Sequence, residues 1–248
     1  MAGKGSFGWY ELSTSDPAAA EAFYKTVVGW GSEAFGGDMP YTVLTAGGLG
    51  VGGLSAPQAG TEPKGWTGYV MVEDADATAA SIKQAGGAIH YGPDDIPGVG
   101  RFAVCADPQG AAFNLMTPAG MGREFPAPGS LGTIGWHELH TAGWEKAWDF
   151  YSGHFGWAKS QAMDMGDMGT YQLFSDGGVD VGAMMNSPNM PRPTWLFYFR
   201  VNSIAAAIER LKTAGGQVLM GPHEVPGGDW IVQGADPQGV MFALVGAK

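Results

Sequence analysis

The sequence contains a single cysteine, Cys105, among its 248 residues. One cysteine forms no internal disulfide, so the apolar core must hold the fold, and the chain suits a reducing compartment such as the cytoplasm. No histidine or lysine adjoins Cys105 in the sequence. We therefore expect this residue to be a small core side chain and not a nucleophile.

Basic residues are also few, since 13 Lys and Arg stand against 24 Asp and Glu. They form no cluster, so nucleic acid and anionic membranes are poor partners. There is no run of about 18 apolar residues and no charged leader followed by an apolar segment, so nothing indicates export or membrane insertion. Neither GxGxxG after a strand nor GxxxxGK[ST] occurs, and nucleotide binding has no support. We expect a cytoplasmic protein whose partner is a small molecule.

What the sequence does contain is a repeat. Gly-Trp-Tyr-Glu-Leu at 8–12 returns as Gly-Trp-His-Glu-Leu at 135–139, and further pairs follow at a shift of about 127 to 130 residues. These pairs are Phe23-Tyr24 with Phe150-Tyr151, Gly29-Trp30 with Gly156-Trp157, Gly86-Gly87 with Gly215-Gly216, and Ala-Asp-Pro-Gln-Gly at 106–110 with 235–239. A period of this length is the size of a small domain. We predict a first domain at 1–119, a linker at 120–130 and a second domain at 131–248.

Each half contains two similar modules, in which a strand precedes a helix and further short strands. The modules are expected at 5–55 and 66–117 in the first half and at 132–187 and 194–246 in the second. Asp16-Pro17 is typical of a helix start, because Asp caps free N–H groups and Pro fits the first turn. The helices are predicted near 18–28, 75–85, 144–154 and 203–214, with strands from 88 to 91 and from 217 to 220 among the others. The two Asp-Pro-Gln-Gly sequences are predicted to be type I turns without a chemical role.

These motifs together resemble the vicinal oxygen chelate superfamily, which includes glyoxalases, bleomycin-resistance proteins, extradiol dioxygenases and related epimerases. The resemblance extends over nearly the whole chain, twice. It implies an α+β fold of two tandem domains, each made of paired βαβββ modules that form a cupped mixed sheet. Helices would lie outside the cup and a ligand inside it.

The resemblance also implies where a metal would bind. Metal-dependent members hold a divalent ion with His and Glu side chains from several strands, and the ion acts as a Lewis acid. The matching positions in this sequence are Trp9, Thr67, Asn114 and 51–54 in the first half, and Trp136, Leu196, Ala243 and 181–184 in the second. These positions carry no useful set of ligands, so we expect no metal and no other cofactor. A register shift of one residue would bring His137 into the cup, but its alignment with Tyr10 favours a place under the helices.

Residues two apart on a strand share a face, which predicts the lining of each cup. The expected ligand-binding residues are Trp9, Tyr69, Asn114, Trp136, His140, Tyr198 and Arg200, and the candidate catalytic residues are Glu11 and Glu138. An aromatic wall with one carboxylate suits a planar or cationic small molecule. Three alternatives stay open: the aromatic residues belong to the core, Glu138 pairs with Arg200, or Glu138 and His140 form a partial metal site or an acid/base pair.

Two functions from different classes follow. The first is metal-free binding of a small apolar or aromatic molecule, similar to the bleomycin-resistance branch. The alternative is a glyoxalase-like lyase, isomerase or epimerase in which Glu138 or Glu11 removes a proton next to a carbonyl. Burial against a tryptophan would raise the pKa of such a glutamate toward neutrality. Since the duplication supplies two domains in one chain, we expect a monomer and not a homodimer.

Overall fold

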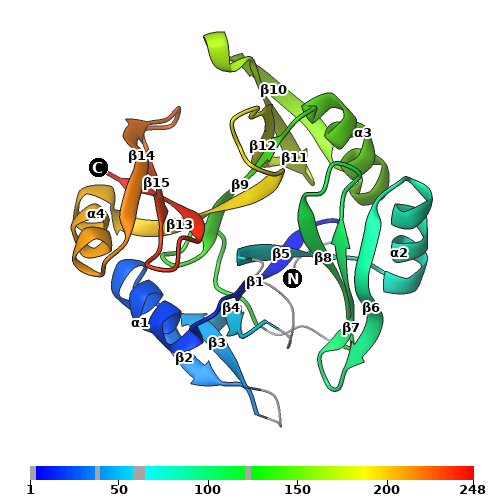
Figure 1. Cartoon of the computed structure of the whole chain (residues 1–248), viewed down its shortest axis with the longest axis horizontal. Coiled ribbons are helices and arrows are strands. Elements are labelled where there is room, and N and C mark those ends of the chain that lie inside the picture. Colours follow the sequence, from blue (N-terminus) through cyan, green and yellow to red (C-terminus); the bar gives the residue numbers. More distant parts are fainter. Residues whose placement is uncertain (1–3, 37–39, 58–64, 121–123) are drawn as a thin grey trace. The chain divides into compact units, whose positions relative to one another are not determined.

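The computed structural model describes residues 4–36, 40–57, 65–120 and 124–248. Figure 1 colours the chain along its sequence, from blue at the N-terminus to red at the C-terminus. The first half contains β1 (Phe7–Ser13), α1 (Pro17–Val27), β2 (Gly31–Ala34), β3 (Tyr41–Ala46), β4 (Leu49–Ser55), β5 (Gly65–Met71), α2 (Ala75–Gln84), β6 (Ala88–Ile96), β7 (Gly100–Ala106) and β8 (Ala112–Pro118). The second half contains β9 (Ile134–Thr141), α3 (Trp144–Phe155), β10 (Ala158–Asp164), the short η1 (Gly166–Met168), β11 (Thr170–Asp176), β12 (Val179–Asn186), β13 (Thr194–Ser203), α4 (Ile204–Thr213), β14 (Gln217–Glu224), β15 (Trp230–Ala235) and β16 (Met241–Ala247).

Each half forms one eight-stranded mixed sheet. The strand order is β2-β3-β4-β1-β5-β8-β7-β6 in the first half and β10-β11-β12-β9-β13-β16-β15-β14 in the second. Within a module, the first and last strands pair in parallel, as β1 does with β4 and β13 with β16. Strands joined by hairpins pair antiparallel, as β7 does with β8. This confirms the expected α+β fold of paired βαβββ modules.

The chain also divides into two compact units, and each unit takes one module from each half. One unit comprises residues 1–9, 67–123 and 137–195, and the other comprises 10–66, 124–136 and 196–248. The domain limits at 119 and 131 stay a prediction drawn from the repeat. Residues 121–123 of the expected linker lie outside the described residues.

The unit that holds α1 and α4 explains two of the repeated motifs. The Asp16 side chain accepts a hydrogen bond from the Ala19 N–H at 3.0 Å and so caps α1. Farther along this helix, the buried Tyr24 hydroxyl lies 3.2 Å from an Asp236 carboxylate oxygen in the Asp-Pro-Gln-Gly turn, and it accepts a hydrogen bond from Trp66 Nε1 at 2.9 Å. Burial, together with the Asp236 carboxylate, holds the pKa of Tyr24 well above its usual value. The Phe-Tyr and Asp-Pro-Gln-Gly motifs therefore meet in the core.

The unit that holds α2 and α3 repeats this arrangement. Trp195 Nε1 donates to the Tyr151 hydroxyl at 3.0 Å, and burial together with the charge of the Asp107 carboxylate raises the pKa of Tyr151 well above its usual value. Asp107 Oδ1 also accepts from the backbone N–H groups of Gln109 at 2.8 Å and Ala111 at 2.9 Å. Each Asp-Pro-Gln-Gly turn thus stabilises itself through backbone N–H groups that donate to its own aspartate side chain, which agrees with the structural role expected for it.

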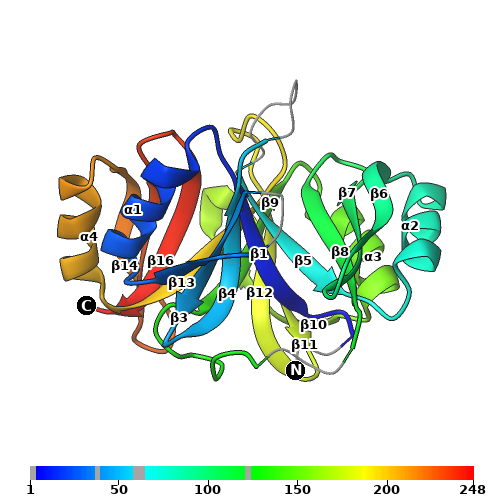
Figure 2. The same ribbon diagram turned by 90° about the horizontal axis from the view of Figure 1, so that it is seen from below.

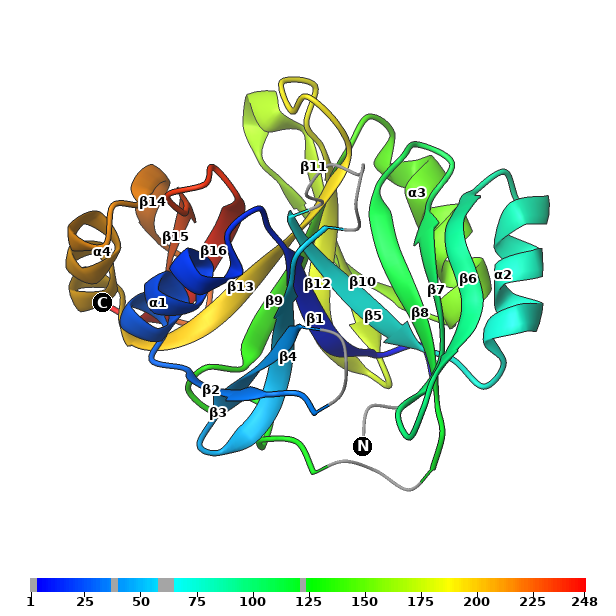
Figure 3. The same ribbon diagram turned by 60° about the horizontal axis from the view of Figure 1, so that its bottom comes forward.

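Helix α3 depends on tertiary structure for its start. Gly143 stands at its N-cap and offers no side chain, but Asn186 Oδ1, at the end of β12, accepts from the Trp144 N–H at 2.8 Å. The helices cover the sheets within their own units, α2 against β6, β7 and β8 and α4 against β14, β15 and β16 (Figures 2 and 3). Among the described residues, no helix has both the length and the apolar character that crossing a membrane requires.

The sequence pattern missed two strands and shortened two others. β2 and β10 stand at the ends of their sheets and are mostly exposed, so they lack the apolar alternation of a half-buried strand. β6 and β14 run on to Ile96 and Glu224, past the Gly-Pro pairs at 92–93 and 221–222 where strand ends were expected. Both are edge strands, and an edge strand tolerates proline because its missing N–H leaves no ladder position unpaired.

Because the Tyr24 hydroxyl has buried partners, we predict that removing this hydroxyl group destabilises the fold. In Tyr24→Phe, the indole N–H of Trp66 and the carboxylate of Asp236 would lose a buried partner, so we expect the free energy of unfolding to fall by about 1–3 kcal/mol. Tyr91→Phe is the matched control, because the Tyr91 hydroxyl bonds the exposed Asp94 at 2.7 Å, and its cost should be about 0.5 kcal/mol or less. Urea unfolding would measure both. Equal losses would contradict the role given to the buried contact.

Candidate functional site

Strands β5 and β8 carry an aromatic and apolar face in one unit. Their parallel register places Tyr69 beside Asn114 and Met71 beside Met116. Tyr69, Met71 and Met116 form a buried cluster, against which Trp9, Ile96 and Phe102 pack. Trp9, Tyr69 and Met116 therefore share a face, as the period of two predicted. Asn114 Nδ2 donates to Thr67 Oγ1 at 3.1 Å, and both side chains are buried.

Strands β13 and β16 form the corresponding face in the other unit. Leu196, Tyr198, Ala243 and Val245 make a buried cluster, and Trp136, Ile231 and Met241 pack against it. Two polar groups border this cluster: Gln233 Nε2 donates to the Tyr198 hydroxyl at 2.9 Å, and Arg200 Nη2 donates to Asp229 at 2.7 Å. The pairing of Arg200 with Asp229 replaces the pairing with Glu138 that the sequence left open. Among the described residues, Arg200 Nε is buried and lacks a hydrogen-bond partner.

The four expected ligand positions do not suit a divalent ion. In the first half, Thr67 Oγ1 is occupied by the Asn114 amide, and Trp9 packs against the apolar cluster. In the second half, Leu196 and Ala243 are apolar and fully buried. Indole, methyl and amide groups are not a donor set for zinc, manganese or iron. Within the part of the chain that the structure describes, no three His, Cys, Asp or Glu side chains gather as metal ligands.

A buried polar cluster surrounds Glu138. His140 Nε2 lies 2.7 Å from Glu138 Oε1, and the Tyr171 hydroxyl donates to Glu138 Oε2 at 2.7 Å. His140 Nδ1 lies 2.7 Å from Ser187 Oγ. The side chains of Glu138 and His140 are 7% and 11% exposed. The structure thus joins the two residues that the sequence proposed as a pair, and adds a tyrosine and a serine.

Hydrogen-bond chemistry assigns the protons in this cluster. When Glu138 is ionised its carboxylate only accepts, so Tyr171 and His140 Nε2 both donate to it. In a neutral imidazole one nitrogen donates and the other accepts. With Nε2–H directed at Glu138, Nδ1 is the acceptor and the Ser187 hydroxyl donates to it.

The first half contains a simpler version of this cluster around Glu11. Ser55 Oγ donates to Glu11 Oε1 at 2.8 Å, and the Tyr41 hydroxyl lies 3.4 Å from Glu11 Oε2. Tyr41 covers Gly53, where a Cβ atom would come within 2.1 Å of the hydroxyl. Glycine at this position therefore lets the tyrosine reach the glutamate.

Sequence reasoning missed the partners of both glutamates. Tyr41 and Tyr171 stand at equivalent positions of the repeat, 130 residues apart, so comparing the halves for recurring polar residues could have found them. Ser187 has no such signal, because Pro57 stands at its counterpart position. Gln233 lies on β15, where alternation with Ile231 could have placed both on the inner face.

His137 lies on the opposite face of β9 from Glu138. It is buried, its Nδ1 lies 2.7 Å from the Val181 carbonyl oxygen, and its ring stacks on Phe7 with centroids 4.5 Å apart. Desolvation lowers the pKa of His137 to about 4, although the bond to Val181 acts in the other direction. His137 is therefore a core residue whose Nδ1 has a hydrogen-bond partner, as its alignment with Tyr10 indicated.

This pKa predicts a pH dependence of stability. Below about pH 6.5 the unfolded chain binds a proton at residue 137, whereas the folded chain does not until about pH 4, so stability falls as the pH is lowered between these values. Between pH 7 and pH 5, the free energy of unfolding should fall by about 2 kcal/mol less in His137→Phe than in the wild-type protein. Urea unfolding at both pH values checks this. The exposed His90→Phe is the control, and an unchanged pH dependence in His137→Phe would refute the assignment.

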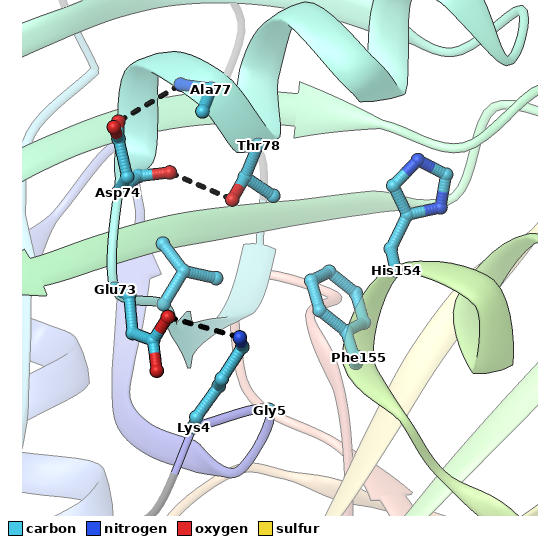
Figure 4. A pocket seen from close by; sticks show the side chains of 9 residues that line it. Lys4, Gly5, Glu73, Asp74, Ala77, Thr78, His154 and Phe155 are labelled. Atoms are coloured by element: carbon cyan, nitrogen blue, oxygen red, sulfur yellow. Dashed lines mark hydrogen bonds and ion pairs between the residues drawn. The ribbon is translucent and has the colours of Figure 1, made fainter.

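A separate hollow lies beside the start of α2 (Figure 4). It measures about 200 Å³ and is lined by Lys4, Glu73, Thr78 and His154 among others. Lys4 pairs with Glu73 at 3.0 Å, the Thr78 hydroxyl donates to the Asp74 carbonyl oxygen, and Asp74 caps the helix. The polar groups of this hollow therefore stabilise the local structure, and we assign the hollow no chemical role.

Comparison with known proteins agrees with this fold. The model of the Glyoxalase/Bleomycin resistance protein/Dioxygenase superfamily matches residues 6–115 and 133–244, one match in each half. The chain belongs to this superfamily.

Individual relatives are similar over nearly their whole length. CFP32 from Mycobacterium tuberculosis, named as a candidate glyoxylase, is 31% identical over 98% of this chain and 95% of its own. The anthracycline biosynthesis protein DnrV from Streptomyces peucetius is 31% identical over 97% and 93%. Among solved structures, the Mn(II)-bound glyoxalase from Novosphingobium aromaticivorans has a TM-score of 0.70 at 20% identity over 99% of this chain and 83% of its own. The 2,3-dioxygenase LapB from Pseudomonas sp. KL28 has a TM-score of 0.69 at 14% identity over 100% and 93%. These two likenesses concern the fold alone.

Proposed function

We propose that this chain binds a small aromatic molecule without the metal ion of its metal-dependent relatives. The observation that carries the proposal is the replacement of the expected metal ligands by apolar and aromatic side chains. Trp136 packs on the cluster of Leu196, Tyr198, Ala243 and Val245. The flat rings of Trp136 and Tyr198 suit planar apolar molecules, because such molecules bury apolar area against a ring and stack on it with an offset.

Polar groups at the same face support a ligand that carries an oxygen atom. Arg200 is held by Asp229, and its buried Nε has no acceptor among the described residues. A buried donor without a partner costs about 1–3 kcal/mol, so a carbonyl or phenolic oxygen placed there would be bound favourably. We therefore propose an aromatic ketone or phenol as the ligand class. The names of DnrV and DauV associate those relatives with anthracycline biosynthesis, and anthracyclines belong in the first screen.

Binding of anthraquinone-2-sulfonate, a water-soluble planar aromatic ketone, tests this proposal. Titration followed by tryptophan fluorescence should give saturable binding that persists in EDTA. Trp136→Leu should weaken it about tenfold or more, because it removes one aromatic wall. Trp148→Leu on α3 is the matched control, since Trp148 lies under the Lys159 ammonium and outside this face. Binding that requires a divalent ion, or that is unchanged in Trp136→Leu, would refute the proposal.

One observation favours a second function. Glu138 is buried, and its two oxygens are oriented by His140 and Tyr171. A carboxylate positioned in this way can remove a proton next to a carbonyl group, and His140 can hold or return that proton. This would make the chain a glyoxalase-like isomerase, lyase or epimerase that uses its own side chains as acid and base.

Proton exchange measures this activity directly. In D₂O the protein should accelerate exchange of the methylene protons of hydroxyacetone, as followed by proton NMR. Glu138→Gln should slow the catalysed exchange about 100-fold or more, because the amide cannot accept the proton. Glu11→Gln reports whether the first half contributes, and the exposed Glu145→Gln controls for surface charge. Catalysis that survives in Glu138→Gln would exclude Glu138 as the base.

A further inference from the structure

We propose that Ser187, His140 and Glu138 form a serine nucleophile site that transfers the acyl group of an activated ester to water. This inference goes beyond the binding and proton-transfer functions above, and it does not depend on the aromatic face. It rests on three side chains of one compact unit and on their hydrogen bonds.

The geometry has the three parts that an activated serine requires. Ser187 Oγ lies 2.7 Å from His140 Nδ1, and the other ring nitrogen, Nε2, lies 2.7 Å from Glu138 Oε1. The carboxylate fixes the tautomer that leaves Nδ1 without a proton, so Nδ1 accepts the proton of the serine hydroxyl. Nucleophile, base and orienting carboxylate are recognised by these roles and not by their order in the sequence.

Backbone hydrogen bonds hold the serine in place. β12 pairs in parallel with β9, which sets Asn186 beside Thr141. The Ser187 N–H then donates to the Thr141 carbonyl at 2.8 Å, and the Ser187 carbonyl accepts from Met190 N–H at 3.0 Å. Ser187 is half-buried, and Pro188 after it is exposed. The hydroxyl is therefore fixed at the end of a strand, next to a solvent-accessible turn.

The first half shows that the fold does not need this arrangement. Ser13 stands where the second half has His140, and Pro57 stands where it has Ser187. Glu11 still receives a serine and a tyrosine hydroxyl from its own module. The two halves therefore differ at both positions, and the arrangement of serine, histidine and glutamate needs both His140 and Ser187. A purely structural hydrogen bond on Glu138 could have been made by a serine alone, as at Glu11.

The chemical step is balanced by groups on the chain and by water. Ser187 Oγ attacks the ester carbonyl carbon as its proton moves to His140 Nδ1. The bond from carbon to the leaving oxygen then breaks, and the leaving alkoxide takes the proton from His140. Water adds to the acyl-serine through the same base, releases the carboxylic acid and restores the Ser187 hydroxyl.

A fluorophosphonate probe tests the reactivity of Ser187 without knowledge of the substrate. Intact-protein and peptide mass spectrometry should find one adduct, on Ser187, and none in Ser187→Ala. His140→Gln and Glu138→Gln should each slow labelling about 100-fold or more, because the base or its orientation is lost. Ser81→Ala is the matched control: Ser81 Oγ lies 3.2 Å from His154 Nε2 on the surface, so labelling of Ser187 should be unchanged and Ser81 itself unlabelled.

Three outcomes would overturn the proposal. The first is no adduct on Ser187 in folded wild-type protein under conditions that label a standard serine hydrolase. The second is labelling of Ser187 at an unchanged rate in folded His140→Gln, with folding checked by circular dichroism. The third is equal labelling of Ser81, which would show nonspecific reaction. Anthraquinone-2-sulfonate binding in Ser187→Ala is measured separately, so failure of one proposal is distinguishable from failure of the other.

Discussion

In each compact unit, a buried tyrosine hydroxyl meets the carboxylate of an Asp-Pro-Gln-Gly turn from the other half of the sequence. The Tyr24 hydroxyl lies 3.2 Å from an Asp236 carboxylate oxygen, and the charge of the Asp107 carboxylate acts on the buried Tyr151 hydroxyl. Each tyrosine hydroxyl also accepts an indole N–H, so both buried hydroxyls have a hydrogen-bond partner in the core. A buried hydroxyl–carboxylate contact of this kind accepts few other geometries. It therefore specifies which module of one half packs with which module of the other.

The two halves share this framework but differ in the residues that surround Glu11 and Glu138. Both keep a glutamate on the first strand of the repeat and a tyrosine hydroxyl directed at it. In the first half the second partner is Ser55, whereas in the second half it is His140, which in turn contacts Ser187. Of these two arrangements, the second alone contains an imidazole ring.

The side chains at the family's ligand positions differ from the His and Glu ligands of metal-dependent members. A metal-dependent member satisfies the carboxylate in its cup with a cation, which also polarises the substrate. Here the buried carboxylate of Glu138 is satisfied by tyrosine and histidine donors instead. Charge-assisted hydrogen bonds make such a group stable inside the protein and orient it.

The sequence by itself determined the repeat, the four modules, most strands and helices, and the face on which Trp9, Tyr69, Trp136 and Tyr198 lie. These features follow from local periodicity, caps and turns, which adjacent residues encode. It did not determine the edge strands β2 and β10, because exposed strands need no apolar alternation. Nor could it pair Ser187 with His140 or Asn186 with the start of α3, since these partners lie more than 40 residues apart in the chain. Only the parallel pairing of β9 with β12 brings such residues together, and that register is a property of the folded sheet and not of any local segment.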